Sequence, residues 1–252
     1  MALQLSIKHA PVEDSHGPLE QRKWPCREFV RSACNLCGHS DAKVLATENG
    51  MPVVQCNACG LVYVNPRPSD QELKRFYRHY LRSEVSGQWK RATYKLFETD
   101  QKRIGEFFHT ERLLDIGCGF GYFLELMAQS GWEVHGCDLS EAALEYGRSQ
   151  LGLRNLTYGP FQELDYPPRY FDVVTAWYAL HHTSDPRSVL IRTGQVLKQR
   201  GIVALRVPNL DLFRILWLLK HLDSPLVRAL LKILRKDTAD TNRAPFNVLD
   251  PP

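Results

Sequence analysis

From residue 110 onward, short apolar runs alternate with amphipathic stretches, and this alternation constrains the fold more than any other feature of the chain. The apolar runs predict strands at residues 112–116, 132–137, 156–158, 171–176 and 202–207, and the stretches between them predict helices at 122–129, 141–150 and 187–198. Parallel strands need crossovers, which helices usually supply. The alternation therefore predicts an α/β domain over residues 110–209, a Rossmann-like doubly wound fold with a mostly parallel sheet.

Two helices are predicted ahead of this domain, between residues 67 and 109. Ser69 and Glu72 have the spacing of a capping box, and apolar residues follow at helical spacing up to residue 80. A second helical pattern covers residues 89–108. We expect this region to be a helical linker or cap.

The first 66 residues contain little that could build an apolar core. Residues 1–30 combine prolines and charges without periodicity, which predicts a mobile tail. Residues 31–66 hold two Cys-x-x-Cys-Gly turns, and eighteen residues separate the two pairs. The cysteines are Cys34, Cys37, Cys56 and Cys59. Each turn can present two thiolates to one ion, and the separation is typical of a four-cysteine zinc site.

The alternative for these cysteines is a pair of unrelated redox motifs, but two copies at this spacing favour zinc. Four thiolates leave no open coordination position, so the predicted Zn²⁺ site is structural, and a module with so little core would gain its stability from the metal. Cys118 and Cys137 have no partner at metal-ligand spacing and are predicted to be small buried residues.

A glycine-rich loop follows the first strand of the α/β domain. Asp115 ends the strand, and the helix begins at Tyr122, where a dinucleotide-binding pattern would require glycine. The glycines between them are Gly117, Gly119 and Gly121. They allow a ligand to approach the backbone at a helix N-terminus. Asp138 ends the next strand, where a carboxylate can accept both hydroxyls of a ribose.

These motifs resemble those of the class I methyltransferases that use S-adenosylmethionine. The glycine loop matches their first motif and Asp138 their ribose-binding acid. A Phe-Asp-Val-Val strand begins at Phe171, and a Leu-His-His-Thr-Ser-Asp-Pro turn begins at Leu180. Residues 34–68 are similar to the zinc-binding head on one branch of these enzymes, whose members often modify sugars or other small biosynthetic intermediates. The resemblance covers residues 33–209.

The resemblance implies a site for S-adenosylmethionine. It assigns the three loop glycines to the methionine end of the cofactor, Asp138 to the ribose and Leu139 to the adenine. Phe161 and Gln162 are expected to line the adenine pocket, where many relatives have an acidic residue. The full implied set is Asp115, Gly117, Cys118, Gly119, Gly121, Asp138, Leu139, Phe161, Gln162 and Trp177.

Three residues after the fourth strand are candidate catalytic groups. Tyr178, His181 and His182 follow that strand at the carboxyl edge of the sheet, where ligands bind in such folds. The histidines could transfer a proton, or they could form a helix-entry pair packed under the cofactor. The sulfonium methyl group is already electrophilic, so the main task of the protein is to align it with the acceptor.

The composition of the chain limits the partners and the location that can be expected for it. The formal net charge is +4, which is too small to predict binding to nucleic acid. The apolar stretch 212–222 contains Arg214, Lys220 and His221 and is shorter than the roughly 20 residues of a membrane span. No signal peptide is recognised, so a cytoplasmic protein without a transmembrane segment is expected.

The carboxyl end departs from the class I pattern. That fold has seven strands, whereas the sequence predicts five, followed by an apolar and basic helical stretch over residues 210–236. We expect residues 210–252 to be a helical extension at the truncated end of the catalytic domain, so that the last two strands of the fold are missing.

Three functions fit these features. The leading one is methyl transfer to a small-molecule acceptor, for example a sugar or a biosynthetic intermediate. The second is RNA methylation, with the zinc module gripping the nucleic acid, but the modest charge and the lack of a basic and aromatic cluster argue against it. The third is a non-catalytic binding protein that keeps the fold. The oligomeric state is not predicted.

Overall fold

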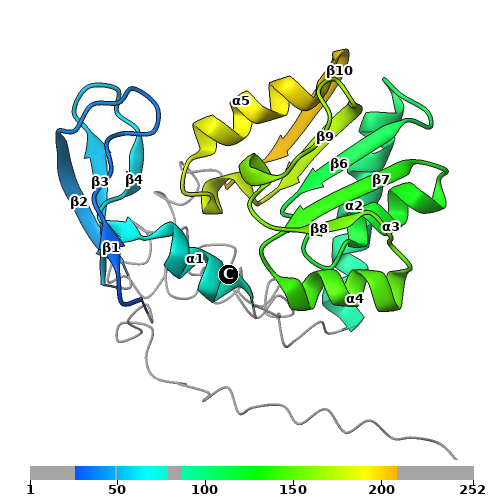
Figure 1. The fold of residues 1–252 in the computed structure, drawn as a ribbon, viewed down its shortest axis with the longest axis horizontal. Helices are drawn as coiled ribbons and strands as arrows, with labels where there is room; N and C mark the ends of the chain where they lie inside the picture. Colours follow the sequence, from blue (N-terminus) through cyan, green and yellow to red (C-terminus); the bar gives the residue numbers. More distant parts are fainter. Residues whose placement is uncertain (1–25, 49, 79–86, 209–252) are drawn as a thin grey trace, which may run out of the picture.

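The computed structural model describes residues 26–48, 50–78 and 87–208. Figure 1 shows two parts, a small β module and a larger α/β domain, with helix α1 (Asp70–Arg78) between them. Residues 1–25 of the predicted tail, which was expected over 1–30, and the predicted extension over 210–252, with its missing strands, lie outside the described residues.

The α/β domain is built on a five-stranded sheet in which every neighbouring pair is parallel. Its strands are β6 (Arg112–Ile116), β7 (Glu133–Asp138), β8 (Leu156–Tyr158), β9 (Phe171–Trp177) and β10 (Leu197–Arg206). The order is β10-β9-β6-β7-β8, so the chain leaves β6 to one side and later returns to the other. Ligands of such folds bind at the carboxyl ends of the strands on either side of this reversal.

Helices cover both faces of the sheet, as predicted. They are α2 (Gly87–Gly105), α3 (Tyr122–Gln129), α4 (Glu141–Leu151) and α5 (Pro186–Val196). Leu113 belongs to one core cluster, with residues from α2, α3 and α4, and its neighbour Leu114 to a second cluster with residues from α5. Side chains alternate along a strand, so consecutive apolar residues fill opposite cores. This confirms the doubly wound fold.

One predicted boundary is wrong. The sequence predicts a helix over 187–198 and a strand over 202–207, but α5 ends at Val196 and β10 begins at Leu197. Leu197 pairs with Phe171 and packs against the second core, and Lys198 Nζ forms an ion pair with Asp172 at 2.8 Å. These long-range contacts override a local helical pattern.

The amino-terminal module contains a sheet that the sequence analysis did not predict. Strands β2 (Ala42–Glu48), β3 (Met51–Cys56) and β4 (Val62–Val64) form an antiparallel sheet in the order β2-β3-β4. Strand β1 (Phe29–Val30) pairs with β5 (Arg67–Pro68). Residues 29 and 30 therefore belong to the folded module and not to the expected tail, because β1 finds its backbone partners in a distant strand, with Phe29 opposite Pro68 and Val30 opposite Arg67.

Helix α1 begins as the capping pattern predicts, but only half of the box is formed. Ser69 Oγ accepts a hydrogen bond from the Glu72 amide at 3.3 Å. The Ser69 amide donates instead to the Glu28 carbonyl, and Glu72 accepts from the Arg27 amide.

Helix α2 covers Gly87–Gly105, so it begins and ends earlier than the predicted helix over 89–108. In the described part of the chain, no helix combines the length and apolarity needed to cross a membrane.

Candidate functional site

The loop between β6 and α3 is shaped by three glycines with positive φ. These angles are 71° at Gly117, 53° at Gly119 and 84° at Gly121. A Cβ atom on Gly117 would lie 2.4 Å from the Ala179 Cβ, and one on Gly121 would lie 2.4 Å from the Leu153 Cδ1, whereas nothing lies within 4 Å at Gly119. Two glycines are thus required by the packing of the chain itself, and Gly119 faces open space.

The backbone of this loop is held against the end of β7. The amides of Gly117 and Cys118 both donate to the Cys137 carbonyl, at 2.8 and 3.1 Å. The Gly119 amide donates to Asp138 Oδ2 at 2.8 Å. The loop is therefore ordered by the protein, and a ligand would not have to organise it.

Asp138 ends β7 beside this loop. Its Oδ1 accepts a hydrogen bond from the Ser140 amide at 2.7 Å, and its Oδ2 accepts the bond from Gly119. Desolvation by burial raises the pKa of the carboxyl, and the two amides oppose that rise. An ionised carboxylate has about four lone-pair positions, so each oxygen retains room for a hydroxyl donor.

Asp115 has a partner inside the protein. Its side chain is 2% exposed, and Oδ1 accepts a hydrogen bond from Thr175 Oγ1 at 2.7 Å, across the parallel pairing of β6 with β9. Desolvation by burial raises the pKa of Asp115 to about 7. Sequence reasoning missed Thr175, although a polar residue within the apolar run of β9 is a detectable signal.

The residues expected near adenine differ in exposure. Leu139 and Gln162 are half-buried. Phe161, the first residue of η2 (Phe161–Glu163), is 3% exposed and packs in the second core, with its ring centroid 6.1 Å from that of Tyr166. The side-chain surface open to a ligand is thus that of Leu139 and Gln162.

The candidate catalytic residues gather where β9 ends. Tyr178 has a φ of 55°, unusual for a residue with a side chain, and is 48% exposed. His181 and His182 lie in η3 (Leu180–His182), with ring centroids 4.0 Å apart. Partial burial lowers the pKa of His181, which favours the neutral ring that can accept a proton.

An ion pair that the sequence did not reveal lies behind Tyr178. Arg206 Nη2 is 2.6 Å from both carboxylate oxygens of Asp100, which is 3% exposed on α2. The guanidinium lies 5.1 Å from the ring centroid of Trp177 and 5.7 Å from that of Tyr178. The Tyr178 amide also donates to the Arg206 carbonyl at 2.8 Å. Asp100 and Arg206 are 106 positions apart, so no local pattern could link them.

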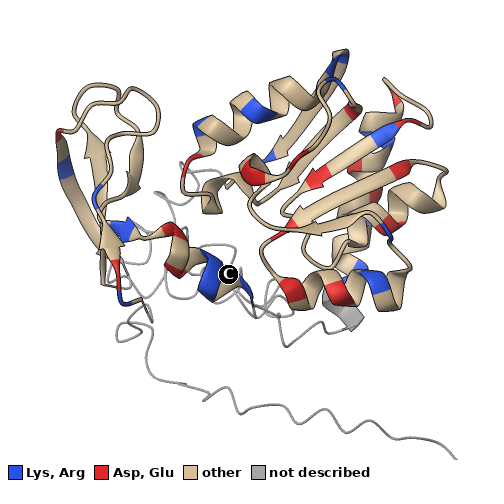
Figure 2. Ribbon diagram, viewed as in Figure 1, with Lys and Arg blue, Asp and Glu red and all other residues tan. Residues whose placement is uncertain are grey.

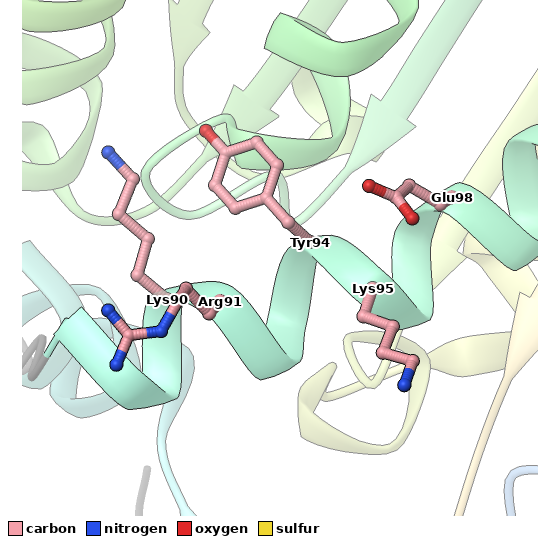
Figure 3. A pocket seen from close by; sticks show the side chains of 5 residues that line it. All are labelled: Lys90, Arg91, Tyr94, Lys95 and Glu98. Carbon is pink, nitrogen blue, oxygen red and sulfur yellow. The ribbon is translucent and has the colours of Figure 1, made fainter.

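A pocket on α2 involves other residues. Figure 3 shows the side chains that line it, with Lys90 and Tyr94 extending to one side of the helix and Lys95 pointing away. Lys90 Nζ lies 5.1 Å from the ring centroid of Tyr122, at the start of α3. The residues that line the pocket are Lys90, Arg91, Tyr94, Lys95 and Glu98. None of the predicted site residues lines this pocket.

The four predicted metal ligands come together in the amino-terminal module. Their sulfur atoms all lie within 4.8 Å of one another, with Cys34 3.5 Å from Cys59 and Cys37 3.6 Å from Cys56. Four sulfurs at about 2.3 Å from a tetrahedral ion would be separated by roughly 3.8 Å. The arrangement therefore fits zinc.

Each cysteine pair sits in the same backbone turn. The Gly38 amide donates to the Cys34 carbonyl at 2.8 Å, and the Gly60 amide to the Cys56 carbonyl at 3.0 Å. Both glycines are left-handed, with φ of 76° and 77°. Backbone hydrogen bonding at the sulfur, from Cys59 first, lowers the pKa of the Cys56 thiol. The Cys59 thiol accepts a backbone hydrogen bond from Leu61, but burial and the neighbouring sulfurs outweigh it and raise the pKa of this thiol. Of these two thiols, Cys56 more readily forms the thiolate that binds metal.

Comparison with known proteins agrees with this geometry. The profile of a methyltransferase domain matches residues 77–239. The ubiquinone biosynthesis O-methyltransferase of Alkalilimnicola ehrlichii is 34% identical over 140 residues, which are 51% of this chain and 52% of that protein. The enzyme of the same name from Yersinia enterocolitica is 32% identical over 153 residues, which are 56% and 58% of the two chains.

Among solved structures, an S-adenosylmethionine-dependent methyltransferase from Archaeoglobus fulgidus is similar, with 27% sequence identity, a TM-score of 0.42, and coverage of 48% of this chain and 59% of that one. The chain spans about half the length of the curated relatives that it matches. The family match, in contrast, covers more than half of the 252 residues. This chain therefore belongs to the family of class I methyltransferase domains.

Proposed function

We propose that this chain binds S-adenosylmethionine at the glycine loop and Asp138 and transfers its methyl group to a small-molecule acceptor. The observation that carries the proposal is the open space at Gly119 beside a carboxylate already oriented by two backbone amides. Both features lie at the carboxyl edge of a parallel sheet, where the strand order reverses.

In this proposal each residue has a limited task. When bound, the cofactor supplies an electrophilic methyl group. Asp138 accepts the ribose hydroxyls through its remaining lone pairs, and the loop holds the methionine end. Tyr178, His181 and His182 line the acceptor side. His181, whose lowered pKa favours the neutral ring, takes the proton that a hydroxyl acceptor loses.

The names of the relatives support the class of acceptor that we propose. Those named above are O-methyltransferases of ubiquinone biosynthesis, which supports a hydroxyl group on a small biosynthetic intermediate as the acceptor. A sugar acceptor is the narrower form of this proposal, and it rests on the resemblance of the cysteine module to the zinc-binding head of sugar-modifying enzymes.

The cysteine module is proposed to hold one structural Zn²⁺. The sulfur separations and the paired turns support it. The seven cysteines, all of them among the described residues, form no disulfide bonds with one another, as a reducing compartment would keep them, and this supports a location in the cytoplasm.

RNA methylation is the less supported alternative. The net charge is only +4, and Figure 2 shows acidic and basic residues interspersed along the described helices and strands. A nucleic-acid site would need basic residues concentrated on one face.

The experiment combines calorimetry with methyl transfer. The 252-residue chain is titrated with S-adenosylmethionine and then incubated with the methyl-labelled cofactor and hydroxylated aromatic compounds, sugar nucleotides or transfer RNA. We expect saturable cofactor binding and label in one of the small-molecule classes. Label found only in RNA would favour the alternative, and an absence of cofactor binding would refute the proposal.

A further inference from the structure

The first cysteine turn lies against the segment that carries the histidine pair. Asn35 sits between Cys34 and Cys37, and its Nδ2 donates a hydrogen bond to the carbonyl of Ser184 at 3.2 Å. Asn35 is half-buried, and Ser184 lies two residues beyond His182. A metal-site turn is thus bonded directly to a backbone atom 149 positions away, next to the candidate catalytic residues.

The second cysteine turn provides an internal comparison. Asn57 occupies the same position between Cys56 and Cys59, but its Nδ2 donates to Asp41 Oδ2 at 2.9 Å, within the module. The two turns share their backbone hydrogen bonds and their left-handed glycines. The zinc site alone therefore does not explain why Asn35 reaches the α/β domain.

Helix α1 brings the two parts together along the same edge. In Figure 1 it runs from the module past the carboxyl ends of the strands towards α4. The Tyr77 ring centroid lies 6.4 Å from that of His182. Lys74 pairs with Glu163 at 2.8 Å and Arg78 with Glu141 at 3.0 Å.

These two ion pairs are too exposed to fix the position of the histidines. The side chains of Lys74 and Glu163 are 38% and 58% exposed, and those of Arg78 and Glu141 are 54% and 53% exposed. Exposed pairs of this kind contribute little because water and salt screen them. The hydrogen bond from half-buried Asn35, in contrast, is made directly to the backbone carbonyl of Ser184.

We propose that the first cysteine turn positions the segment 180–185, and with it His181 and His182, through the hydrogen bond from Asn35 to Ser184. Metal binding orders the turn, the turn orients the amide of Asn35, and the amide holds the Ser184 carbonyl. Asn35 is a positioning residue and does not touch the reacting atoms. The effect of this positioning on catalysis rests on the proposed function, because that proposal places the two histidines on the acceptor side.

The test compares Asn35→Ala with Asn57→Ala in the whole 252-residue chain loaded with zinc. Each substitution removes one side-chain hydrogen bond from one turn, and only the first removes a bond to the α/β domain. Hydrogen exchange of a peptide covering residues 180–185 is expected to be roughly five-fold faster in Asn35→Ala, as loss of one hydrogen bond would give, and unchanged in Asn57→Ala.

A second readout follows the histidine rings. In protein labelled at histidine, the ring resonances of His182, assigned with His182→Gln, should shift in Asn35→Ala and stay in place in Asn57→Ala. If exchange in 180–185 and the His182 resonances are the same in Asn35→Ala as in the unaltered chain, the proposal is overturned.

Zinc content is measured for both variants. If Asn35→Ala loses its zinc, the unaltered chain is treated with a chelator instead. Faster exchange in 180–185 with unchanged exchange in β7 would then support the coupling, and unchanged exchange in both would overturn it. Titration of the same samples with S-adenosylmethionine tests the proposed function separately, because cofactor binding does not depend on the exchange result.

Discussion

The cysteine module and the α/β domain obtain their stability from different sources. In the described part of residues 31–66, the buried apolar residues are Cys34, Met51, Val54 and Cys56, and two of these are predicted metal ligands. In the α/β domain, two clusters of ten buried residues each fill the spaces between the sheet and its helices.

The contrast shows that two parts of one chain can be stabilised in different ways. Apolar burial contributes about 25 cal/mol per Å², so the α/β domain can be stable through packing alone. The module buries too little for this, and its stability must come from elsewhere, which four convergent thiols can provide. Stability from packing and stability from metal binding should respond differently to substitution and to removal of the metal.

Removing the metal should have the largest effect, and it should be confined to the module. Structural zinc sites contribute on the order of 10–16 kcal/mol to folding. After chelation, backbone amides of β2–β4 should lose protection from hydrogen exchange, while those of β6 and β9 keep theirs. Equal loss of protection in both parts would show that the two do not fold independently.

A substitution in the core of the α/β domain should destabilise that domain and leave the metal site of the module unchanged. Phe123 is 1% exposed in the first core cluster, and Phe123→Ala should lower the free energy of unfolding by about 3–5 kcal/mol. Zinc content should remain at one ion per chain. Phe107 is 69% exposed, so Phe107→Ala serves as the control and should change stability by less than about 0.5 kcal/mol.

The buried carboxyl of Asp115 should make the α/β domain less stable at higher pH. Burial raises its pKa from the ordinary 3.8 to about 7, so the folded state binds the proton more tightly than the unfolded state. Its contribution to stability is full below pH 4 and is lost as pH rises from 4 through 7.

Asp115→Asn removes this titration and keeps an acceptor for Thr175. Urea unfolding at pH 5 and pH 8 should show a decline for the unaltered chain that is smaller in the variant, by on the order of 2 kcal/mol. The exposed Asp165→Asn serves as the control. An identical decline in Asp115→Asn would mean that Asp115 ionises normally.

The ion pairs between α1 and the α/β domain should matter least. Lys74→Ala removes a pair whose side chains are 38% and 58% exposed, so the melting temperature should change only slightly, as expected for a contribution of about 0–1 kcal/mol. A large loss of stability would show that α1 is clamped to the domain by charge.

The features that local sequence determines were predicted well. The strands of the α/β domain could be located because apolar runs of the correct length alternate with amphipathic helical stretches. The four cysteines meet as their spacing predicts.

The features that depend on distant contacts were missed. The strands of the module carry few buried apolar residues, so no apolar pattern marked them in the sequence. The Asp100–Arg206 pair and the bond from Asn35 to Ser184 join residues more than 100 positions apart. The sequence assigns all three loop glycines to a ligand, whereas Gly117 and Gly121 also have steric reasons that only the packed structure reveals.

The most direct test of the central proposal is the affinity of Asp138→Ala for S-adenosylmethionine, measured by calorimetry beside the unaltered chain and the exposed-acid control Asp165→Ala. Asp138 is expected to accept two charge-assisted hydrogen bonds from the ribose, each contributing roughly 1.5–3 kcal/mol, so its loss should weaken binding by about a hundred-fold or more. The melting temperature of each variant is measured as well, because Asp138 also accepts the amides of Gly119 and Ser140. Weakened binding in Asp138→Ala alone, with the fold retained, is the result that we predict. Unchanged affinity in Asp138→Ala would contradict the placement of the cofactor.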